Sequence, residues 1–374
     1  MSFRPFAVEQ FLSENEHNVA FNFSESGVHP LTYKELLDIA GVDPAALLDM
    51  RVDYPQVNGS ELLRGRIAAI YGATPDQVLV TVGATEANTL VAATLLEPGD
   101  NLVHFRPTYE QLPGNAANLG FETRAVPYLP ETGWGIDHEA LEQAVDHNTR
   151  IIHVVNPNNP TGRVLSAVDR QGIIDTAARV GAWIVADEVY AGTERKNAEP
   201  TASFWGSYDR VIAINSMSKA YGLPGLRLGW MVAPEPVISA CWRRHEYAAI
   251  SATTLAMALA EAALAPAARA ALMARARKLI RRGFDRLQSR LDSRPGRFSV
   301  VPPEASAMSF VGFDLPVSSQ DLALTLLREQ DLLLIPGAEF GIEARFRFSS
   351  ALPDSYLDAG LDRLILATDK MLEA

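Results

Sequence analysis

The sequence predicts an α/β fold in which a mostly parallel sheet has helices on both faces and is joined to a smaller α+β domain. Short apolar runs alternate with helical segments through most of the chain, which is typical of a sheet covered on both faces. The last part of the chain instead mixes short strands with helices. The length of 374 residues and the 48% hydrophobic content are sufficient for two domains or for one large domain with an appendage.

An N-terminal arm precedes the first predicted helices. Residues 1–30 show no helical or strand periodicity and are predicted to be irregular. Thr32 and Glu35 form a plausible capping box for a helix over 33–40, and a second amphipathic helix covers 61–71. We expect the arm to pack with the C-terminal tail, because the sheet lies between them in sequence.

The predicted sheet begins after these helices. A strand at 78–82 is followed by a turn of small residues at 83–85 and a helix at 86–96, a layout in which N–H groups at a helix start can bind a phosphate. Ligands of parallel sheets bind at the carboxyl ends of strands, so polar residues that follow these strands are expected to share one site. The remaining strands are predicted at 102–105, 151–155, 183–186, 211–214 and 226–232, with helices at 137–145 and 168–180.

The C-terminal part is predicted to be helical and then mixed. Residues 255–294 form long helices rich in alanine, leucine and arginine. Five basic residues in them are interpreted as a solvated face: Arg275, Arg277, Lys278, Arg281 and Arg282. We expect an arm at 1–45, a large domain at 46–260 and a small domain at 261–374. In the tail, strands are predicted at 299–301, 306–312, 332–335 and 345–349, with helices at 319–329 and 355–372.

Composition excludes several function classes. The net charge of −12 argues against nucleic-acid and anionic-membrane partners. Cys241 is the only cysteine and the seven histidines include no His-x-x-x-His pair, so no metal site is predicted. No stretch approaches the roughly 18 apolar residues that a spanning helix needs, and the first residues lack the features of a signal peptide. We therefore expect a cytoplasmic protein.

The segment after the strand at 211–214 carries the most informative chemistry. Ser216, Ser218, Lys219 and Arg227 follow this strand, and the other four of the five lysines lie in predicted helices or in a polar loop. A lysine at a strand end can form a Schiff base with an aldehyde, and two hydroxyls with a guanidinium can hold a phosphate. Pyridoxal 5'-phosphate (PLP) needs this combination. The alternative is a surface loop with an ordinary solvated lysine.

Four other residues that follow strands meet further needs of PLP. Asp187 is the candidate carboxylate that keeps the pyridine nitrogen protonated. Asn159 and Tyr190 could donate hydrogen bonds to the phenolate oxygen, and Tyr109 could stack on the ring. The alternatives are a loop aspartate at 187 and plain core packing for Tyr109.

An amino-acid substrate would also bring a carboxylate, which a planar guanidinium binds best. Arg347 lies on a predicted strand between two phenylalanines and is the candidate for this role. Arg345 lies two residues away on the same face and is its competitor.

Together these pieces resemble the class I/II aminotransferase family of fold-type I PLP enzymes. The resemblance implies that Lys219 forms the internal aldimine and that the large domain has the fold-type I architecture. It also implies a homodimer with shared active sites, in which Tyr54 reaches into the partner's site. It assigns the phosphate to Ala84, Thr85, Ser216, Ser218 and Arg227, the pyridine nitrogen to Asp187, the phenolate oxygen to Asn159 and Tyr190, the ring to Tyr109, and the substrate carboxylate to Arg347.

The N-terminal arm is similar to that of capreomycidine synthase and related PLP enzymes that act on arginine or hydroxyarginine. The segments that carry this similarity are residues 8–12 and 24–29. It implies that Glu9, Gly27 and His29 contact the substrate. Glu9, Glu14 or Glu16 could meet a guanidinium, and His29 could move protons. The alternative for Glu9 and His29 is a surface or packing role.

Three reactions fit these residues, because each begins when Lys219 removes the proton from Cα. The first is a cyclase or dehydratase that converts a hydroxylated arginine to a cyclic guanidino amino acid of the capreomycidine or enduracididine type. The second is an aminotransferase that releases a 2-oxo acid, and the third is an oxygen-dependent arginine oxidase or hydroxylase. A regulator or inactive binding module with the same fold is the non-enzymatic alternative.

Overall fold

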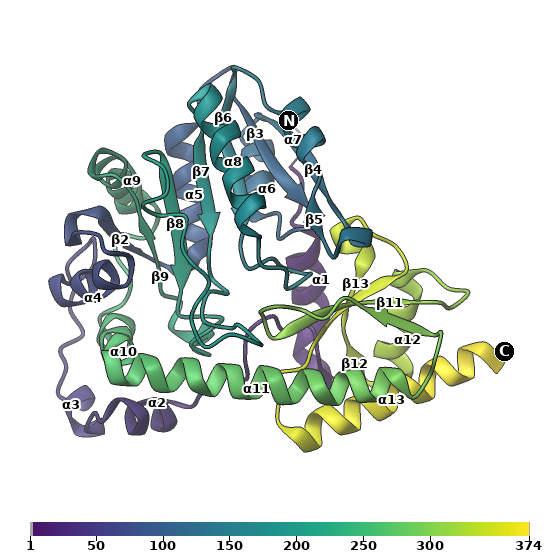
Figure 1. The fold of residues 1–374 in the computed structure, drawn as a ribbon. Helices are drawn as coiled ribbons and strands as arrows, with labels where there is room; N and C mark the ends of the chain where they lie inside the picture. Colours follow the sequence, from purple (N-terminus) through teal and green to yellow (C-terminus); the bar gives the residue numbers. More distant parts are fainter. Residues whose placement is uncertain (1–2, 374) are drawn as a thin grey trace.

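The computed structural model describes residues 3–373 and confirms the predicted α/β fold (Figure 1). The core of the large part is an eight-stranded sheet in which four neighbouring strand pairs are parallel. The strand order is β2 (Val78–Thr81), β9 (Gly229–Val232), β8 (Val211–Ser216), β7 (Trp183–Asp187), β6 (Thr149–Val155), β3 (Asn101–Arg106), β4 (Glu122–Leu129) and β5 (Gly135–Ile136).

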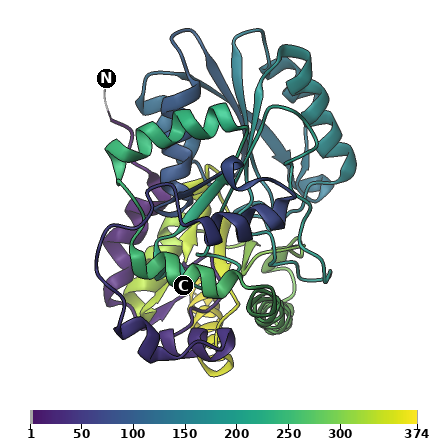
Figure 2. The same cartoon turned by 90° about the vertical axis from the view of Figure 1, so that its left-hand side faces the viewer.

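Helices cover both faces of this sheet because successive strand residues point to opposite sides. Ile151 packs on one side with α5 (Gly83–Leu95), and its neighbour Ile152 packs on the other side with α8 (Ala167–Val180). Figure 2 looks along the helix α11 (Pro266–Asp292) from the β2 end of the sheet, where α4 (Glu61–Tyr71) and α10 (Thr254–Leu264) lie. One face carries α5, α6 (Gln111–Asn118) and α9 (Glu235–Ala248), and the other carries α7 (His138–Ala144), α8, α4 and α10.

The strand predicted at 226–232 begins only at Gly229 and runs antiparallel to both neighbours, β2 and β8. The preceding residues form a 3-10 turn, and Arg227 has a left-handed backbone with a φ of 48°. The strand β4 was also not predicted from the sequence. Its first residue, Glu122, is charged and exposed. A strand of this kind lacks the continuous apolar run that identifies a buried strand.

The smaller domain consists of an antiparallel sheet with helices. Its strand order is β10 (Phe298–Val300), β11 (Met308–Phe313), β14 (Arg345–Ser349) and β13 (Ile335–Pro336). The strand predicted at 332–335 is in fact two strands, because β12 (Leu332–Leu333) leaves this sheet and pairs in parallel with β1 (Phe21–Asn22) of the arm. The arm therefore packs with the tail, as expected, while the domain boundaries at 45 and 260 stay a prediction.

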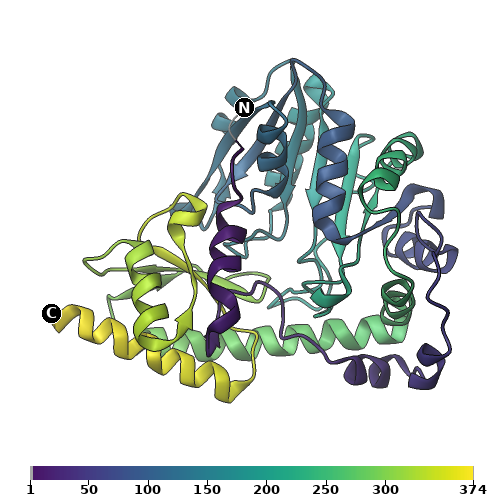
Figure 3. The same cartoon turned by 180° about the vertical axis from the view of Figure 1, so that it is seen from behind.

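The arm is not irregular as predicted, because it contains the helix α1 (Ala7–Asn15). Val8 and Phe11 are spaced one helical turn apart and are both buried against the small domain. The first residues of the helix lie next to the large domain, and Figure 3 shows α1 between the two domains. Only two buried residues mark its apolar face, so the sequence signal was weak.

A single long helix, α11 (Pro266–Asp292), runs beneath both domains and packs against α13 (Asp354–Glu373) (Figure 1). Of the residues that were interpreted as solvated, Arg282 instead pairs with Asp354 of this neighbour. In the middle of α11, a Cβ atom on Gly283 would lie 1.8 Å from the Ser350 carbonyl oxygen. Glycine at this position therefore lets the chain that leaves β14 lie directly against the helix.

Candidate active site

A pocket of about 250 Å³ lies where β6, β7 and β8 end, and it collects most of the residues that the sequence singled out. The carboxyl ends of parallel strands meet at one edge, so residues far apart in sequence converge there. The predicted residues that line it are Glu9, Ala84, Thr85, Tyr109, Asn159, Asp187, Tyr190, Ser216, Ser218, Lys219 and Arg227.

One end of the pocket has the donors of an anion site. The first turn of α5 contributes Ala84 and Thr85, where backbone N–H groups have no partner within the helix. Ser216, Ser218 and Arg227 line the same pocket. The site depends on a glycine: Gly83 has a φ of 76°, and a Cβ atom there would lie 2.7 Å from an Arg227 guanidinium nitrogen.

Asp187 ends β7, lines the same pocket and is 4% exposed. Its carboxylate accepts hydrogen bonds from the Val189 backbone N–H (3.2 Å) and from the Asn88 amide nitrogen (3.3 Å). Burial raises the pKa of Asp187 to about 6, against these hydrogen bonds and the nearby Lys219, which lower it. Such a carboxylate is stabilised by a cationic ligand.

A second buried carboxylate follows directly in the chain. Glu188 accepts hydrogen bonds from the Phe204 N–H (2.8 Å) and the Ser203 hydroxyl (2.9 Å), and burial raises its pKa to about 7. Glu188 does not line the pocket. Burial raises the pKa of Tyr71, and the negative charge of Glu188 raises it further.

Lys219 points into the pocket, and its amine donates a 2.8 Å hydrogen bond to the Ser26 hydroxyl. Burial lowers the pKa of Lys219. The arm comes close at this point, since a Cβ atom on Gly27 would lie 3.1 Å from the Ser218 carbonyl oxygen and 3.6 Å from the Lys219 Cα. An amine whose neutral form is favoured can act as a nucleophile or a base.

Arg347 reaches the pocket region from β14 of the small domain. It is 2% exposed, and it donates hydrogen bonds to the Asn159 amide oxygen (3.0 Å) and to the Ser24 carbonyl oxygen of the arm. Its guanidinium carbon lies 5.5 Å from the centre of the Phe340 ring. Arg345, the competitor, stacks instead on Trp134 and points away from these partners.

Tyr109 and Glu9 form the wall of the pocket on the arm side. The Tyr109 hydroxyl donates a 2.7 Å hydrogen bond to the Glu9 carboxylate. Burial and the Glu9 charge raise the pKa of Tyr109, so the phenol stays protonated. Glu9 therefore faces the pocket from the first turn of α1, and its charge also acts on Lys219 and Arg347.

Four predicted residues do not line the pocket. Gly27 and Arg347 lie beside Lys219 and Asn159, which do line it, whereas Tyr54 and His29 are exposed elsewhere. Tyr54 is 82% exposed and borders a separate hollow of about 720 Å³ together with Val52 and Ile250. His29 is exposed beside Arg275, which donates a hydrogen bond to the His29 carbonyl oxygen. Burial of part of the ring and the Arg275 charge lower the pKa of His29. The roles assigned to Tyr54 and His29 stay predictions.

Two residues with polar side chains that line the pocket, Ser26 and Asn88, were not predicted from the sequence. Asn88 could have been found, because it lies one helical turn after Ala84 and thus on the same face of α5. Ser26 had no comparable signal, since the contact between the arm and Lys219 joins residues 193 positions apart.

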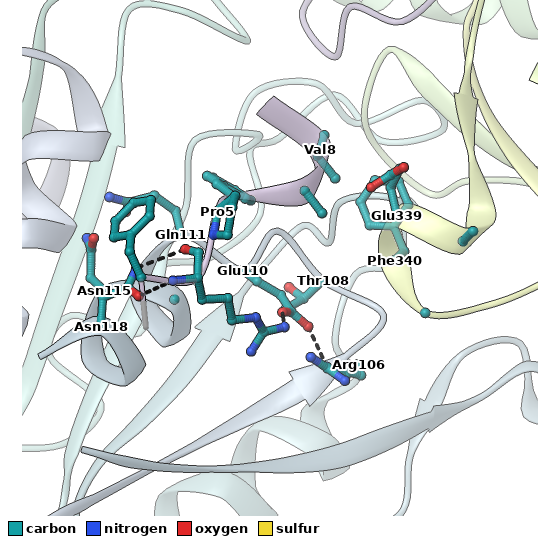
Figure 4. Close-up of a pocket in the computed structure, with 17 residues that line it drawn as sticks. Pro5, Val8, Arg106, Thr108, Glu110, Gln111, Asn115, Asn118, Glu339 and Phe340 are labelled. Atoms are coloured by element: carbon teal, nitrogen blue, oxygen red, sulfur yellow. Dashed lines mark hydrogen bonds and ion pairs between the residues drawn. The ribbon is translucent and has the colours of Figure 1, made fainter. Parts of the chain in front are cut away.

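A further hollow, of about 320 Å³, is lined by the first described residues of the arm and by neighbouring residues of the large domain (Figure 4). Here Arg4 crosses to the large domain: its guanidinium pairs with Glu110 (3.0 Å), and its backbone exchanges two hydrogen bonds with the Asn118 side chain. Arg106 pairs with the same Glu110. These contacts tether the start of the arm beside Tyr109.

Within residues 3–373, no group of three or more His, Cys, Asp and Glu side chains is placed to hold a metal ion. In the same range, no single helix is long and apolar enough to cross a membrane. The pair α10 and α11 meets that criterion only when taken together, and it is bent by 83°.

Comparison with known proteins gives consistent matches. The family described as aminotransferase class I and II matches residues 33–364. Capreomycidine synthase from Streptomyces vinaceus is 31% identical over 364 residues, which cover 95% of this chain and 91% of that protein. A PLP-dependent aminotransferase from Streptococcus suis superposes with a TM-score of 0.93 at 31% identity, covering 99% of each chain. The PLP-dependent cyclase OrfR superposes with a TM-score of 0.88 at 27% identity, covering 99% of this chain and 98% of that one.

Proposed function

Because the chain belongs to the aminotransferase class I and II family, whose members are PLP-dependent enzymes, we propose that it cyclises a hydroxylated arginine. The reaction would remove one water and give a cyclic guanidino amino acid of the capreomycidine or enduracididine type. The observation that carries the proposal is the pair of opposite charges in the site. Arg347 can receive the substrate carboxylate, and Glu9 can receive the guanidinium.

The pocket residues fit PLP. Thr85, Ser216, Ser218 and Arg227 would hold its phosphate beside Gly83, where a larger side chain would displace the arginine. Asp187, whose pKa is raised by burial, would gain a cationic partner in the protonated pyridine nitrogen. When bound, PLP supplies an aldehyde carbon for an amine and a ring that withdraws electrons from the substrate Cα.

The chain's own residues would then bind and deprotonate the substrate. Lys219 has an amine whose pKa is lowered by burial, so it can accept the proton of Cα. The Tyr109 hydroxyl donates a hydrogen bond to the Glu9 carboxylate and so keeps that carboxylate directed at the pocket. In this arrangement the substrate spans from Arg347 to Glu9, with Cα beside Lys219.

The relatives support a cyclase, since the named functions of two similar proteins are capreomycidine synthase and PLP-dependent cyclase. A second candidate is an aminotransferase. It is favoured by the Streptococcus suis structure, which has the same fold along its whole length and is a PLP-dependent aminotransferase. Both reactions begin with proton removal at Cα, and they differ in what leaves: water in the first and a 2-oxo acid in the second.

We also propose that the enzyme works as a homodimer. The large hollow around Tyr54 is bordered by exposed apolar side chains, including Val52 and Ile250. Exposed apolar surface of this kind is typical of an interface between chains. In the proposed dimer Tyr54 reaches the partner's pocket.

The test is a product analysis. Purified protein is incubated with PLP and with arginine or its hydroxylated isomers, with and without 2-oxoglutarate and oxygen, and products are identified by mass. Loss of one water without a co-substrate supports the cyclase. Formation of glutamate from 2-oxoglutarate refutes it in favour of the aminotransferase, and consumption of oxygen refutes it in favour of the oxidase.

A charge variant tests the role of Glu9. Glu9→Gln keeps the size and the contact with Tyr109 but removes the charge, so KM for a guanidino substrate is expected to rise about tenfold or more. Glu14→Gln is the matched control, because Glu14 lies on the same helix, is exposed and does not line the pocket. An unchanged KM in Glu9→Gln contradicts the proposed guanidinium contact.

A further inference from the structure

We infer that Ser26 is a positioning residue for Lys219: its hydroxyl holds the lysine amine in place, so the base is correctly oriented only while the N-terminal arm lies on the pocket. The inference rests on the proposed PLP chemistry, although not on which product forms. It begins from the 2.8 Å hydrogen bond between the Lys219 amine and the Ser26 hydroxyl oxygen. Ser26 is 6% exposed and lines the pocket.

The backbone around Ser26 is fixed on both sides. Before it, the Ser24 carbonyl oxygen accepts a hydrogen bond from Arg347. After it, Gly27 lies against the backbone of the Lys219 loop, and the Val28 N–H donates to the Lys219 carbonyl oxygen (3.4 Å). Ser26 therefore sits between two anchors, one on the small domain and one on the loop that carries the lysine. Its backbone cannot shift without moving one of them.

A hydroxyl suits this position because it both donates and accepts hydrogen bonds. It can accept from the Lys219 ammonium, and it can donate to the neutral amine. The lysine side chain has four carbons with free rotation, and its amine must meet the Cα proton when Lys219 acts as the base. A fixed partner at 2.8 Å limits that freedom.

The charges around Lys219 come from several elements. Acidic groups are Glu9 on α1, Glu25 on the arm and Asp187 on β7, and basic groups are Arg227 and Arg347. Burial is the largest influence and lowers the pKa of Lys219. Removing the Ser26 hydroxyl takes away an acceptor for the ammonium form, so the lysine should lose its proton at a still lower pH.

The first experiment uses protein stripped of cofactor, so it does not depend on turnover. Lys219 is acylated with a limiting amount of an amine-reactive acylating reagent across a range of pH. The extent of labelling is followed by peptide mass spectrometry. We expect the labelling midpoint of Ser26→Ala to fall by about one pH unit. Ser26→Thr, which keeps the hydroxyl, should retain the wild-type midpoint. Ser13→Ala, at an exposed position on α1, is the matched control.

The second experiment measures exchange of the substrate Cα hydrogen with deuterated water in the PLP-loaded enzyme, a step common to all the candidate reactions. Ser26→Ala should slow this exchange about tenfold at saturating substrate, and Ser26→Thr should restore it. If Ser26→Ala does not fold, Ser26→Cys is used, because the thiol is nearly the same size and a weak acceptor.

The outcomes separate this inference from the proposed function. An unchanged labelling midpoint in the alanine or cysteine variant overturns the positioning role. Loss of exchange in Ser26→Thr as large as in Ser26→Ala also overturns it, since a purely steric role would have that effect. Absence of an absorbance band after PLP is added to the wild type refutes the proposed function instead, while the labelling result still stands.

Discussion

Replacing Asp187 by asparagine should stabilise the protein without its cofactor and weaken its binding of PLP. The carboxylate is 4% exposed, and burial raises its pKa to about 6, from an ordinary value of 3.8. A carboxyl group whose folded-state pKa is raised stabilises the fold only while it is protonated. That stabilisation is complete below about pH 4 and is lost as the pH rises through about 6.

The magnitude follows from the size of this shift. A difference of about two pKa units corresponds to about 3 kcal/mol in the free energy of unfolding at pH 7.5. Asparagine has nearly the same shape and cannot ionise. It can still accept from the Val189 N–H, and the Asn88 amide can rotate to offer its oxygen to the new side chain, because that oxygen has no partner. Asp187→Asn should therefore remove most of the free-energy cost of burying the ionised carboxylate.

The assay is urea unfolding of cofactor-free protein at pH 7.5 and at pH 4. The variant should be more stable than the wild type by up to about 3 kcal/mol at pH 7.5, and the difference should disappear at pH 4. Under the proposed role, the variant should also bind PLP at least tenfold more weakly at pH 7.5 in equilibrium dialysis, because no anion faces the pyridinium. Equal stability at pH 7.5, or a gain that persists at pH 4, would refute the reasoning.

Two further predictions concern other parts of the molecule. Gly83→Ala should weaken PLP binding about tenfold, because the new methyl group would displace the Arg227 guanidinium. Gly99→Ala is the matched control, since Gly99 also has a positive φ but open space around its Cβ position, so equal losses would contradict the argument. His153→Leu should reduce acid lability: burial lowers the pKa of His153 to about 3, so its neutral form stabilises the fold above pH 6.5 and that stability is lost as the pH falls toward 3. Between pH 8 and pH 5, the His153→Leu variant should lose about 2 kcal/mol less unfolding free energy than the wild type. The same exchange at the exposed His147 is the control and should have no such effect. An unchanged pH profile in His153→Leu would argue against the burial effect.

Much of the fold could be predicted because the parallel strands are buried on both faces and appear as continuous apolar runs. The same rule explains why β4 was missed, since Glu122 and other outer residues interrupt its apolar pattern. The antiparallel direction of β9 was also unpredictable. Strand direction depends on the path of the chain, and local residues such as Arg227 in its left-handed conformation do not specify it.

The candidate site was predictable to the extent that its residues follow strands. Asp187, Asn159 and Lys219 could be placed together because the carboxyl ends of neighbouring parallel strands share an edge. The arm follows no such rule. Ser26 meets Lys219 only through the way in which the arm packs between the domains, and this depends on contacts with the tail that local sequence does not encode.

The close approach of Gly283 to Ser350 has a consequence for how the two halves of the site stay aligned. An uninterrupted helix of 27 residues is about 40 Å long and resists bending, because bending strains its backbone hydrogen bonds. Ser350 directly follows the strand that carries Arg347, so the contact at Gly283 joins that strand to this helix. Movement of the small domain about this contact would change the distance between Arg347, the proposed carboxylate-binding residue, and Lys219.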